Sequence, residues 1–367
     1  MTEPDPSVPA TMAAVLLTGH GGYEKLDYRT DVATPVPGPG QVLIEVGAAG
    51  INNTDINTRI GWYSKSVTDA TDAGGGAGFG ADTDDDGSWT GDPLRFPRIQ
   101  GADCCGRIVA TGPGVDRDRT GHRVLVRSLQ PDRNSDRPMA CVTLGSELDG
   151  AFAQYTVCDE RDALMIDSDW SDVELASLPC AYSTAEAMLH RGGVGAERVL
   201  ITGASGGVGS AAIQLAKRRG AEVIAVAGSA KADGVAALGA DRVVEREREL
   251  LDQIDRDSVD VVLDLVAGPG FGSLLEALRA GGRYVTSGAI AGPIVDLDVR
   301  TLYLKDLSFF GSTYQPDEIF ENLVFYVEAG EIRPVVAGTY PLADIVEAQQ
   351  EFLDKRHVGK LVLVPPR

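Results

Sequence analysis

Residues 199–209 read VLITGASGGVG, an apolar run that leads directly into a cluster of glycines. The residues that follow, 210–219, are expected to form a helix. A strand, a glycine-rich turn and a helix in this order indicate a dinucleotide-binding loop, because the helix N-terminus offers free N–H groups to phosphates. Ala204 occupies the first position of the G-x-G-x-x-G pattern. Gly206 would let the backbone approach a pyrophosphate, and Gly209 would let the helix pack closely on the strand.

The residues on both sides of this loop alternate between expected strands and expected helices. Beyond the loop, strands are expected at 222–227, 259–266 and 284–287, and helices at 231–238 and 272–279. A further helix is expected before the loop, at 173–191. Strands that alternate with helices predict an α/β fold, in which helices cover both faces of a doubly wound parallel sheet.

The first 160 residues show a different pattern, with short strands separated by glycine and proline. These strands are expected at 12–17, 41–49, 107–111, 122–126 and 150–157, and the tail ends in another, at 357–364. One segment of this part, 64–95, is rich in Asp, Gly, Ser and Thr and carries seven Asp against two basic residues. Because it has little apolar surface to bury, it predicts a long mobile loop.

The chain as a whole has 367 residues, a length typical of two domains. Its net charge of −21 repels nucleic-acid backbones and anionic membranes, so neither is an expected partner. The five cysteines, an odd number without a paired spacing, favour a reduced compartment over a disulfide framework. There is no signal-peptide pattern at the start, and no apolar run approaches the ~20 residues of a membrane span. We therefore expect a cytoplasmic protein.

The end of the second alternating strand, at Ala227, distinguishes between the two nicotinamide cofactors. NAD sites place an acidic residue there for the ribose hydroxyls, whereas this chain continues with Gly228, Ser229 and, two residues later, Lys231. Ser229 and Lys231 would hold a 2′-phosphate, and Arg246 beyond the next strand would add a second charge. These residues predict NADPH, although Lys231 alone would be equally typical of a solvated helix end.

Several blocks resemble, in the same order, the medium-chain dehydrogenase/reductase superfamily. They are GINNTD (50–55), RIGWY (59–63), GADCCGRIVATGPG (101–114), GAFAQY (150–155), LPCAYSTA (178–185), the glycine loop with its helix and second strand (203–226), and VGKLVL (358–363). The resemblance implies a GroES-like, β-rich catalytic domain that is interrupted by a Rossmann domain, with the active site between them. It implies boundaries at 1–165 for the first part of the catalytic domain, 166–312 for the Rossmann domain and 313–367 for the return.

The resemblance also indicates which positions would hold a metal ion. Zinc alcohol dehydrogenases of this superfamily hold the catalytic metal with Cys, His and a second Cys, and these positions are here Asn52, Ala102 and Cys180. With Asp103 after Ala102, one thiolate and at most one carboxylate remain, which is a poor zinc site. The stretch between 127 and 150 has one cysteine, where the structural zinc of the family needs four. We expect neither metal, as in the zinc-independent quinone oxidoreductases.

Without zinc, the substrates that remain easy to reduce are conjugated, namely quinones and α,β-unsaturated carbonyls. Hydride from the nicotinamide would leave an enolate or phenolate oxygen, which needs hydrogen-bond donors. The resemblance implies the amide N–H of Asn52, the hydroxyl of Thr54 at the proton-relay position, and Tyr63, which would donate a proton or cover an aromatic substrate. Tyr63 is equally expected as a packing aromatic, and Asp55 and Arg59 are expected to hold the loop.

The same resemblance places further residues at the nicotinamide, and it places Lys360 near the phosphates unless this lysine only flanks a strand. The complete expected cofactor site is Thr184, Ala204, Ser205, Gly206, Gly207, Val208, Gly209, Ser229, Lys231, Arg246, Val266, Ser287, Gly288, Thr313 and Lys360. Two alternatives stay open: a zinc-free aldehyde or ketone reductase, and an NADPH-binding protein without turnover. The family also implies a homodimer formed through the edge strands of the Rossmann domain.

Overall fold

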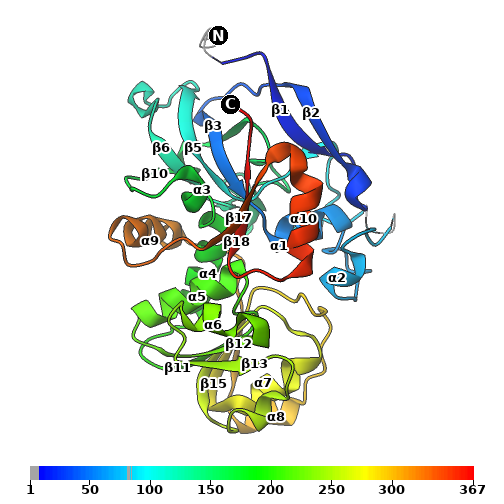
Figure 1. The fold of residues 1–367 in the computed structure, drawn as a ribbon, viewed down its shortest axis with the longest axis vertical. Coiled ribbons are helices and arrows are strands. Elements are labelled where there is room, and N and C mark those ends of the chain that lie inside the picture. The colour runs from blue at the N-terminus through cyan, green and yellow to red at the C-terminus, as the bar shows by residue number, and fades with distance from the viewer. Residues whose placement is uncertain (1–7, 81–82, 84) are drawn as a thin grey trace.

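The computed structural model describes residues 8–367 except 81, 82 and 84, and its ribbon has two lobes (Figure 1). The lower lobe contains a six-stranded parallel sheet in the order β13-β12-β11-β14-β15-β16. Its strands are β11 (Arg198–Ile201), β12 (Glu222–Ala227), β13 (Arg242–Glu245), β14 (Val259–Asp264), β15 (Leu278–Thr286) and β16 (Ser308–Gly311). The strand order reverses between β11 and β14, and ligands of such sheets bind where the carboxyl ends of these strands separate.

Alternate side chains of the strands face two different helical layers. Val199 and Ile201 of β11 join a buried cluster with residues of α4 (Pro179–Arg191), α5 (Gly207–Arg218) and α9 (Asp317–Glu328). Leu200, between them in the sequence, joins a second cluster with residues of α7 (Phe271–Ala277). Because successive residues of a strand point to opposite faces, one apolar run fills both cores. The predicted α/β fold with a sheet covered on both faces is therefore confirmed.

The upper lobe is built from mainly antiparallel strands. The larger sheet has the path β10-β6-β5-β3-β18-β17, with β9 also paired to β3. Its strands are β3 (Gln41–Gly50), β5 (Cys104–Thr111), β6 (Arg123–Val126), β9 (Tyr155–Asp159), β10 (Ala163–Met165), β17 (Val336–Pro341) and β18 (Lys360–Val364). A three-stranded sheet contains β1 (Thr11–Leu17), β2 (Leu26–Ala33) and β4 (Arg98–Ile99), and a small hairpin pairs β7 (Leu129–Pro131) with β8 (Cys141–Thr143).

The tail of the chain returns to the upper lobe, as Figure 1 shows by the red ribbon beside the blue one. There β18 pairs antiparallel with β3, and α10 (Ile345–Asp354) lies near α1 (Asn53–Ile60). The preceding helix α9 packs with α4 and α5, and Asp317 at its start pairs with Arg127 of the upper lobe, so this helix contacts both lobes. The predicted boundary at residue 313 stays a prediction.

Three elements differ from those expected. The helix expected at 173–191 is two helices, α3 (Asp172–Leu175) and α4, and Pro179 stands in the first turn of the second. Proline is tolerated there because its missing N–H would have no partner inside the helix. The helix expected at 272–279 ends at Ala277, and β15 begins at once. The strand expected at 150–157 is interrupted, because its last residues belong to β9 while Ala153 forms an isolated bridge with Ala14.

The acidic segment 64–95, which was expected to be a long mobile loop, contains local structure within its described residues, and its mobility stays a prediction. It contains a short helix, α2 (Thr71–Gly74), and buried side chains of Thr71 and Ser88. The fully buried guanidinium of Arg59 donates to the carbonyl of Gly75 at 2.7 Å, which ties the segment to α1. A few buried residues thus anchor a segment whose composition is otherwise polar. We call residues 64–95 the insert from here on.

Two further helices complete the lower lobe, α6 (Ala232–Ala236) and α8 (Val299–Leu304). Within the described part of the chain, no helix has both the length and the apolar character that crossing a membrane would require.

Candidate active site

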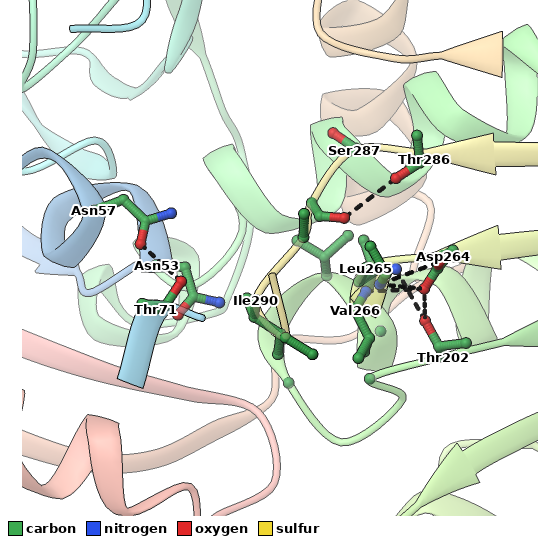
Figure 2. A pocket seen from close by; sticks show the side chains of 18 of the residues that line it. Asn53, Asn57, Thr71, Thr202, Asp264, Leu265, Val266, Thr286, Ser287 and Ile290 are labelled. Atoms are coloured by element: carbon green, nitrogen blue, oxygen red, sulfur yellow. Dashed lines mark hydrogen bonds between the residues drawn. The ribbon is translucent and has the colours of Figure 1, made fainter. Parts of the chain in front are cut away.

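A cavity of about 1610 Å³ lies between the two lobes and receives residues from both. The upper lobe contributes the start of α1, the insert and the first residue of β18, Lys360. The lower lobe contributes the loop after β11 and the segments that follow β14, β15 and β16. Figure 2 shows the two sides facing each other, with Asn53, Asn57 and Thr71 opposite Thr202, Asp264 and Val266.

The glycine loop forms one wall of this cavity. Residues 205–209 line it, and α5 begins at Gly207. A Cβ at Gly209 would lie 2.3 Å from the carbonyl oxygen of Gly203, so only glycine allows the helix to pack this closely on the loop. Ala204 does not line the cavity; it is buried below the loop, and its N–H donates to the carbonyl of Val226 at 3.2 Å.

A group of cations lies at the end of the cavity near β12. Lys231 and Arg246, which are predicted to bind the cofactor, line it, and so does Lys355, which was not singled out from the sequence. The Lys231 ammonium donates to the carbonyl of Lys355 at 2.8 Å, and the Lys355 ammonium donates to Oδ1 of Asn53 at 3.0 Å. Burial, helped by the charge of Lys231, lowers the pKa of Lys355 to about 7.

The few lysines of this chain are concentrated around the cavity that contains Lys355. The chain has only seven lysines, and four of them line this one cavity, namely Lys65, Lys231, Lys355 and Lys360. Such a concentration of a scarce residue type cannot be recognised before the fold brings distant segments together.

Ser229, like Ala204, is a predicted cofactor residue that does not line the cavity. It is exposed, and its N–H donates to the carboxylate of Glu247 at 3.2 Å. Glu247 also pairs with Arg246 at 3.3 Å, so an acidic group lies beside the expected 2′-phosphate position. This acid follows β13, whereas the acid of an NAD site follows the second strand, which is here β12.

Asp264, at the end of β14, is a second residue that sequence reasoning missed. It is fully buried and accepts hydrogen bonds from Thr202 Oγ1 at 2.5 Å and from the N–H of Val266 at 2.9 Å (Figure 2). The hydroxyl of Tyr284 also donates to it at 2.6 Å, and burial together with this carboxylate raises the pKa of that phenol. The carboxylate thereby fixes the turn that presents Leu265 to the cavity.

The remaining residues expected at the nicotinamide do line the cavity. They are Thr184, Val266, Ser287, Gly288 and Thr313. They come from α4 and from the segments after β14, β15 and β16, so three strand ends and one helix meet at this point.

Asn52 lies at the start of α1 in a buried polar cluster with Asp103 and Lys360. Its amide nitrogen donates to Asp103 Oδ2 at 2.9 Å and to the carbonyl of Gly50 at 3.4 Å, and its Oδ1 accepts from the Lys360 ammonium. Lys360 also pairs with Asp103 Oδ2 at 2.8 Å. Both hydrogens of the Asn52 amide therefore have protein acceptors in this structure, and the predicted donation to a substrate would require one of them to move.

The Lys360 ammonium is consequently held beside Asn52 rather than at the phosphate loop, although its side-chain stem passes Gly207. The other oxygen of Asp103 accepts from the N–H of Cys180 at 2.6 Å. Burial raises the pKa of the Cys180 thiol. Among the described residues, no three His, Cys, Asp or Glu side chains are grouped so as to hold a metal ion.

Thr54 and Tyr63, the other predicted catalytic residues, are in contact. The Tyr63 hydroxyl donates to Thr54 Oγ1 at 3.2 Å, and the indole N–H of Trp89, from the insert, donates to the same oxygen at 2.7 Å. The rings of Tyr63 and Trp89 lie 5.0 Å apart. All three residues line the cavity, and Trp89 was not singled out from the sequence.

Asp55 is engaged with the backbone around α1, which agrees with its expected role of holding the loop. Its carboxylate accepts from the N–H groups of Asn52 at 2.7 Å and Ala102 at 3.2 Å. Burial raises its pKa to about 7, against the opposing effect of these bonds and of the Lys360 charge.

Two family models match this chain. Residues 38–168 match the alcohol dehydrogenase GroES-like domain, and residues 207–328 match the zinc-binding dehydrogenase model. The first covers most strands of the upper lobe and all of α1, and the second covers most of the parallel sheet.

Two curated relatives match over nearly their whole length. The acryloyl-coenzyme A reductase of Metallosphaera sedula is 29% identical, with 96% of this chain and 99% of the relative covered. The quinone oxidoreductase of Sus scrofa is 28% identical, with 96% and 98% covered.

Solved structures agree with this assignment. The structure of a candidate alcohol dehydrogenase from Sinorhizobium meliloti 1021 has a TM-score of 0.89 and 46% identity, with 98% of each chain covered. A 2-octenoyl-CoA carboxylase reductase in complex with NADP and 2-octenoyl-CoA has a TM-score of 0.80 and 26% identity, with 98% of this chain and 88% of the other covered. With its GroES-like and Rossmann-type lobes and the cavity between them, the chain belongs to the medium-chain dehydrogenase/reductase superfamily of oxidoreductases.

Proposed function

We propose that this protein is an NADPH-dependent reductase that transfers hydride, without zinc, to a quinone or an α,β-unsaturated carbonyl compound. The observation that carries the proposal is one cavity that joins the glycine loop and three cations to the Asn52–Asp103–Lys360 cluster. The relatives named quinone oxidoreductase and acryloyl-CoA reductase support a conjugated acceptor.

The residues of the cavity fit NADPH. The free N–H groups at the start of α5 suit a pyrophosphate, and Lys231, Arg246 and Lys355 supply positive charge for a 2′-phosphate. The related reductase in complex with NADP supports this cofactor over NADH. When bound, the reduced nicotinamide supplies the hydride.

The donor set does not fit a catalytic zinc ion. Cys180 is the one thiol at the expected position, and a zinc site needs about three nitrogen or sulfur ligands. Both oxygens of Asp103 already accept hydrogen bonds, from the Cys180 N–H and the Asn52 amide, and the carboxylate charge is neutralised by Lys360. We therefore derive no step through a metal.

The side chains of the upper lobe would bind and orient the acceptor. Tyr63 and Trp89 offer an aromatic wall against which a planar conjugated substrate can pack, and both donate a hydrogen bond to the Thr54 hydroxyl. The aromatic wall would also exclude water, which strengthens hydrogen bonds to a developing oxyanion.

The test is NADPH oxidation with 1,4-benzoquinone, 2-cyclohexenone and crotonyl-CoA, each with and without a chelator and each repeated with NADH. Chelator-resistant turnover that prefers NADPH and yields the saturated ketone or the hydroquinone is the expected result. Chelator-sensitive activity, or activity confined to alcohols with NAD⁺, would overturn the proposal.

Two other functions are distinguished by the same assay. A zinc-free aldehyde or ketone reductase would convert an enone to the allylic alcohol, which product analysis identifies. A protein that binds NADPH without turnover would show saturable binding and no oxidation with any acceptor.

We further propose that the protein acts as a cytoplasmic homodimer. The described cysteines are all free, which supports a reduced compartment. An apolar surface formed by Val299, Tyr303 and Leu304 of α8 and Phe309 of the edge strand β16 is exposed, and such a surface supports association between two copies.

A further inference from the structure

Thr54 has an unusually complete set of incoming hydrogen bonds. A threonine hydroxyl has one hydrogen to donate and two lone pairs that accept. Both acceptor positions are used, by Trp89 Nε1 at 2.7 Å and by the Tyr63 hydroxyl at 3.2 Å. An indole N–H can only donate, so the direction of the shorter bond is fixed by chemistry.

The hydrogen of the Thr54 hydroxyl is therefore left to be donated. Among the hydrogen bonds of the described residues, Thr54 Oγ1 donates to no protein acceptor, although buried hydroxyls normally find one. Thr54 is 8% exposed and lines the cavity, so its small open surface faces the ligand space. Its hydrogen is thus directed toward a ligand acceptor.

Tyr63 has a different position in this chain of hydrogen bonds. Its hydroxyl hydrogen is given to Thr54, and burial raises the pKa of the phenol, so it stays protonated. The expectation that Tyr63 itself donates a proton to the substrate is not what this arrangement favours. Tyr63 instead acts on the substrate through Thr54.

We infer that Trp89, contributed by the insert, is a positioning residue for the reduction: with Tyr63 it fills both acceptor sites of Thr54 and directs the Thr54 hydroxyl hydrogen to the carbonyl oxygen of the acceptor. This inference rests on the proposed function. As hydride adds to the conjugated acceptor, negative charge develops on that oxygen, and the Thr54 O–H stabilises it by a hydrogen bond. Two incoming bonds polarise the hydroxyl and strengthen its donation.

A pair of tryptophans provides a matched test. Trp62 and Trp89 both pack on the Tyr63 ring, at 5.7 Å and 5.0 Å between centroids. The Trp62 indole N–H donates to the backbone carbonyl of Asp69 at 3.0 Å, outside the Thr54 network. Phenylalanine at either position keeps an aromatic ring but removes the N–H donor, and the loss of the second ring is common to both variants.

Trp89→Phe should lower kcat for the enone or quinone roughly 10-fold, less than the ~10²–10³-fold loss on removing a direct oxyanion donor, with KM and the Kd for NADPH little changed. Trp62→Phe should stay within about twofold of the wild type, since its lost bond lies elsewhere. Equal losses in both variants would overturn the inference, because they would indicate a role in packing alone.

A double-mutant cycle separates positioning from structure. Thr54→Val should lower kcat about 10²-fold, and Thr54→Ser should restore most of it. In the Thr54→Val background, Trp89→Phe should cause no further loss, because the group through which Trp89 acts is gone. Additive losses would contradict the inference.

A spectroscopic measurement keeps this test independent of turnover. The chain has three tryptophans, so its indole N–H signals are few and the Trp89 signal is identified by its absence in Trp89→Phe. That signal should move upfield in Thr54→Val, where its acceptor is lost. An unmoved signal would refute the hydrogen bond itself, whereas absence of turnover with a normal shift would refute the proposed function.

Discussion

Lys355 is held in a conformation that its type of residue seldom adopts. It lies at the end of α10 with φ of 52°, in the left-handed region, and its ammonium reaches Asn53 of the upper lobe. Burial and the nearby Lys231 lower its pKa to about 7, so near neutral pH it is divided between its charged and neutral forms. A bound phosphate group would favour the charged form.

Lys355→Met should therefore weaken NADPH binding about 10- to 100-fold and leave NADH binding nearly unchanged. In the wild type, NADPH affinity should fall as pH rises from 7 to 9, because above its pKa Lys355 must take up a proton to pair with the 2′-phosphate. The steepest fall in NADPH affinity that one titrating group can cause is tenfold per pH unit. Fluorescence titration at several pH values measures both effects, with NADH as the control. An equal loss of NADH affinity would show that Lys355 does not recognise the 2′-phosphate.

At the residue scale, the sequence could indicate site residues within local motifs but not those that depend on distant contacts. Asn52, Thr54 and Tyr63 were singled out because they lie in the blocks GINNTD and RIGWY that resemble the family, and their roles stay predictions. Lys355 reaches Asn53 across a separation of 302 residues, and Trp89 reaches Thr54 from the insert. Without the fold, no spacing in the chain indicates either contact.

At the scale of elements, the glycine loop combines two separate demands on glycine. A Cβ at Gly209 would meet the backbone of Gly203 at 2.3 Å and of Ala204 at 2.6 Å, neither of which can move like a side chain. A Cβ at Gly206 would have its nearest contact at 3.5 Å, and the φ of −76° suits any residue. Gly209 is therefore required for packing, whereas Gly206 leaves space on the cavity side.

Gly209→Ala should therefore lower the free energy of unfolding by about 1–3 kcal/mol or more, through overpacking. Gly206→Ala should change it by less than about 1 kcal/mol and yet weaken NADPH binding, because the added methyl group occupies space for the pyrophosphate. Urea unfolding and fluorescence titration of the two variants check this contrast. Equal stability losses in both would contradict the separation of roles.

The elements themselves were largely predictable because the alternation of apolar runs and turn residues is a local property. The glycine loop and the parallel strands β11 to β14 were located within a few residues, whereas the break before Pro179, the early start of β15 and the edge strand β16 were not predicted. The composition of the insert did not indicate that Thr71 and Trp89 form hydrogen bonds with side chains of α1, and the mobility of the insert stays a prediction. The composition of a segment does not reveal the contacts of single residues, and a few such contacts decide how the segment packs.

At the scale of the whole molecule, β16 forms an edge of the parallel sheet and α8 presents exposed apolar residues beside it. We expect a mass near twice that of the 38.6 kDa chain by light scattering. Leu304→Glu should shift the protein toward the monomer, since this side chain is 71% exposed and would place a charge in the apolar contact.

Phe325→Glu is the matched control, because Phe325 is 59% exposed on α9, which packs in the cluster with α4 and α5, whereas α8 packs against the cluster with α7. It should leave the mass unchanged. A monomeric wild type, or an equal effect of both variants, would remove the proposed contact surface.

The insert also connects the two lobes directly. The N–H of Thr71 in α2 donates to the carbonyl of Ile290, in the segment after β15, at 3.1 Å, while its hydroxyl donates to Asn57 of α1 (Figure 2). A backbone amide exchanges its hydrogen with the solvent only when its hydrogen bond opens. The rate of deuterium uptake at this single amide therefore measures how often the lobes separate, and a ligand that holds them together would lower that rate.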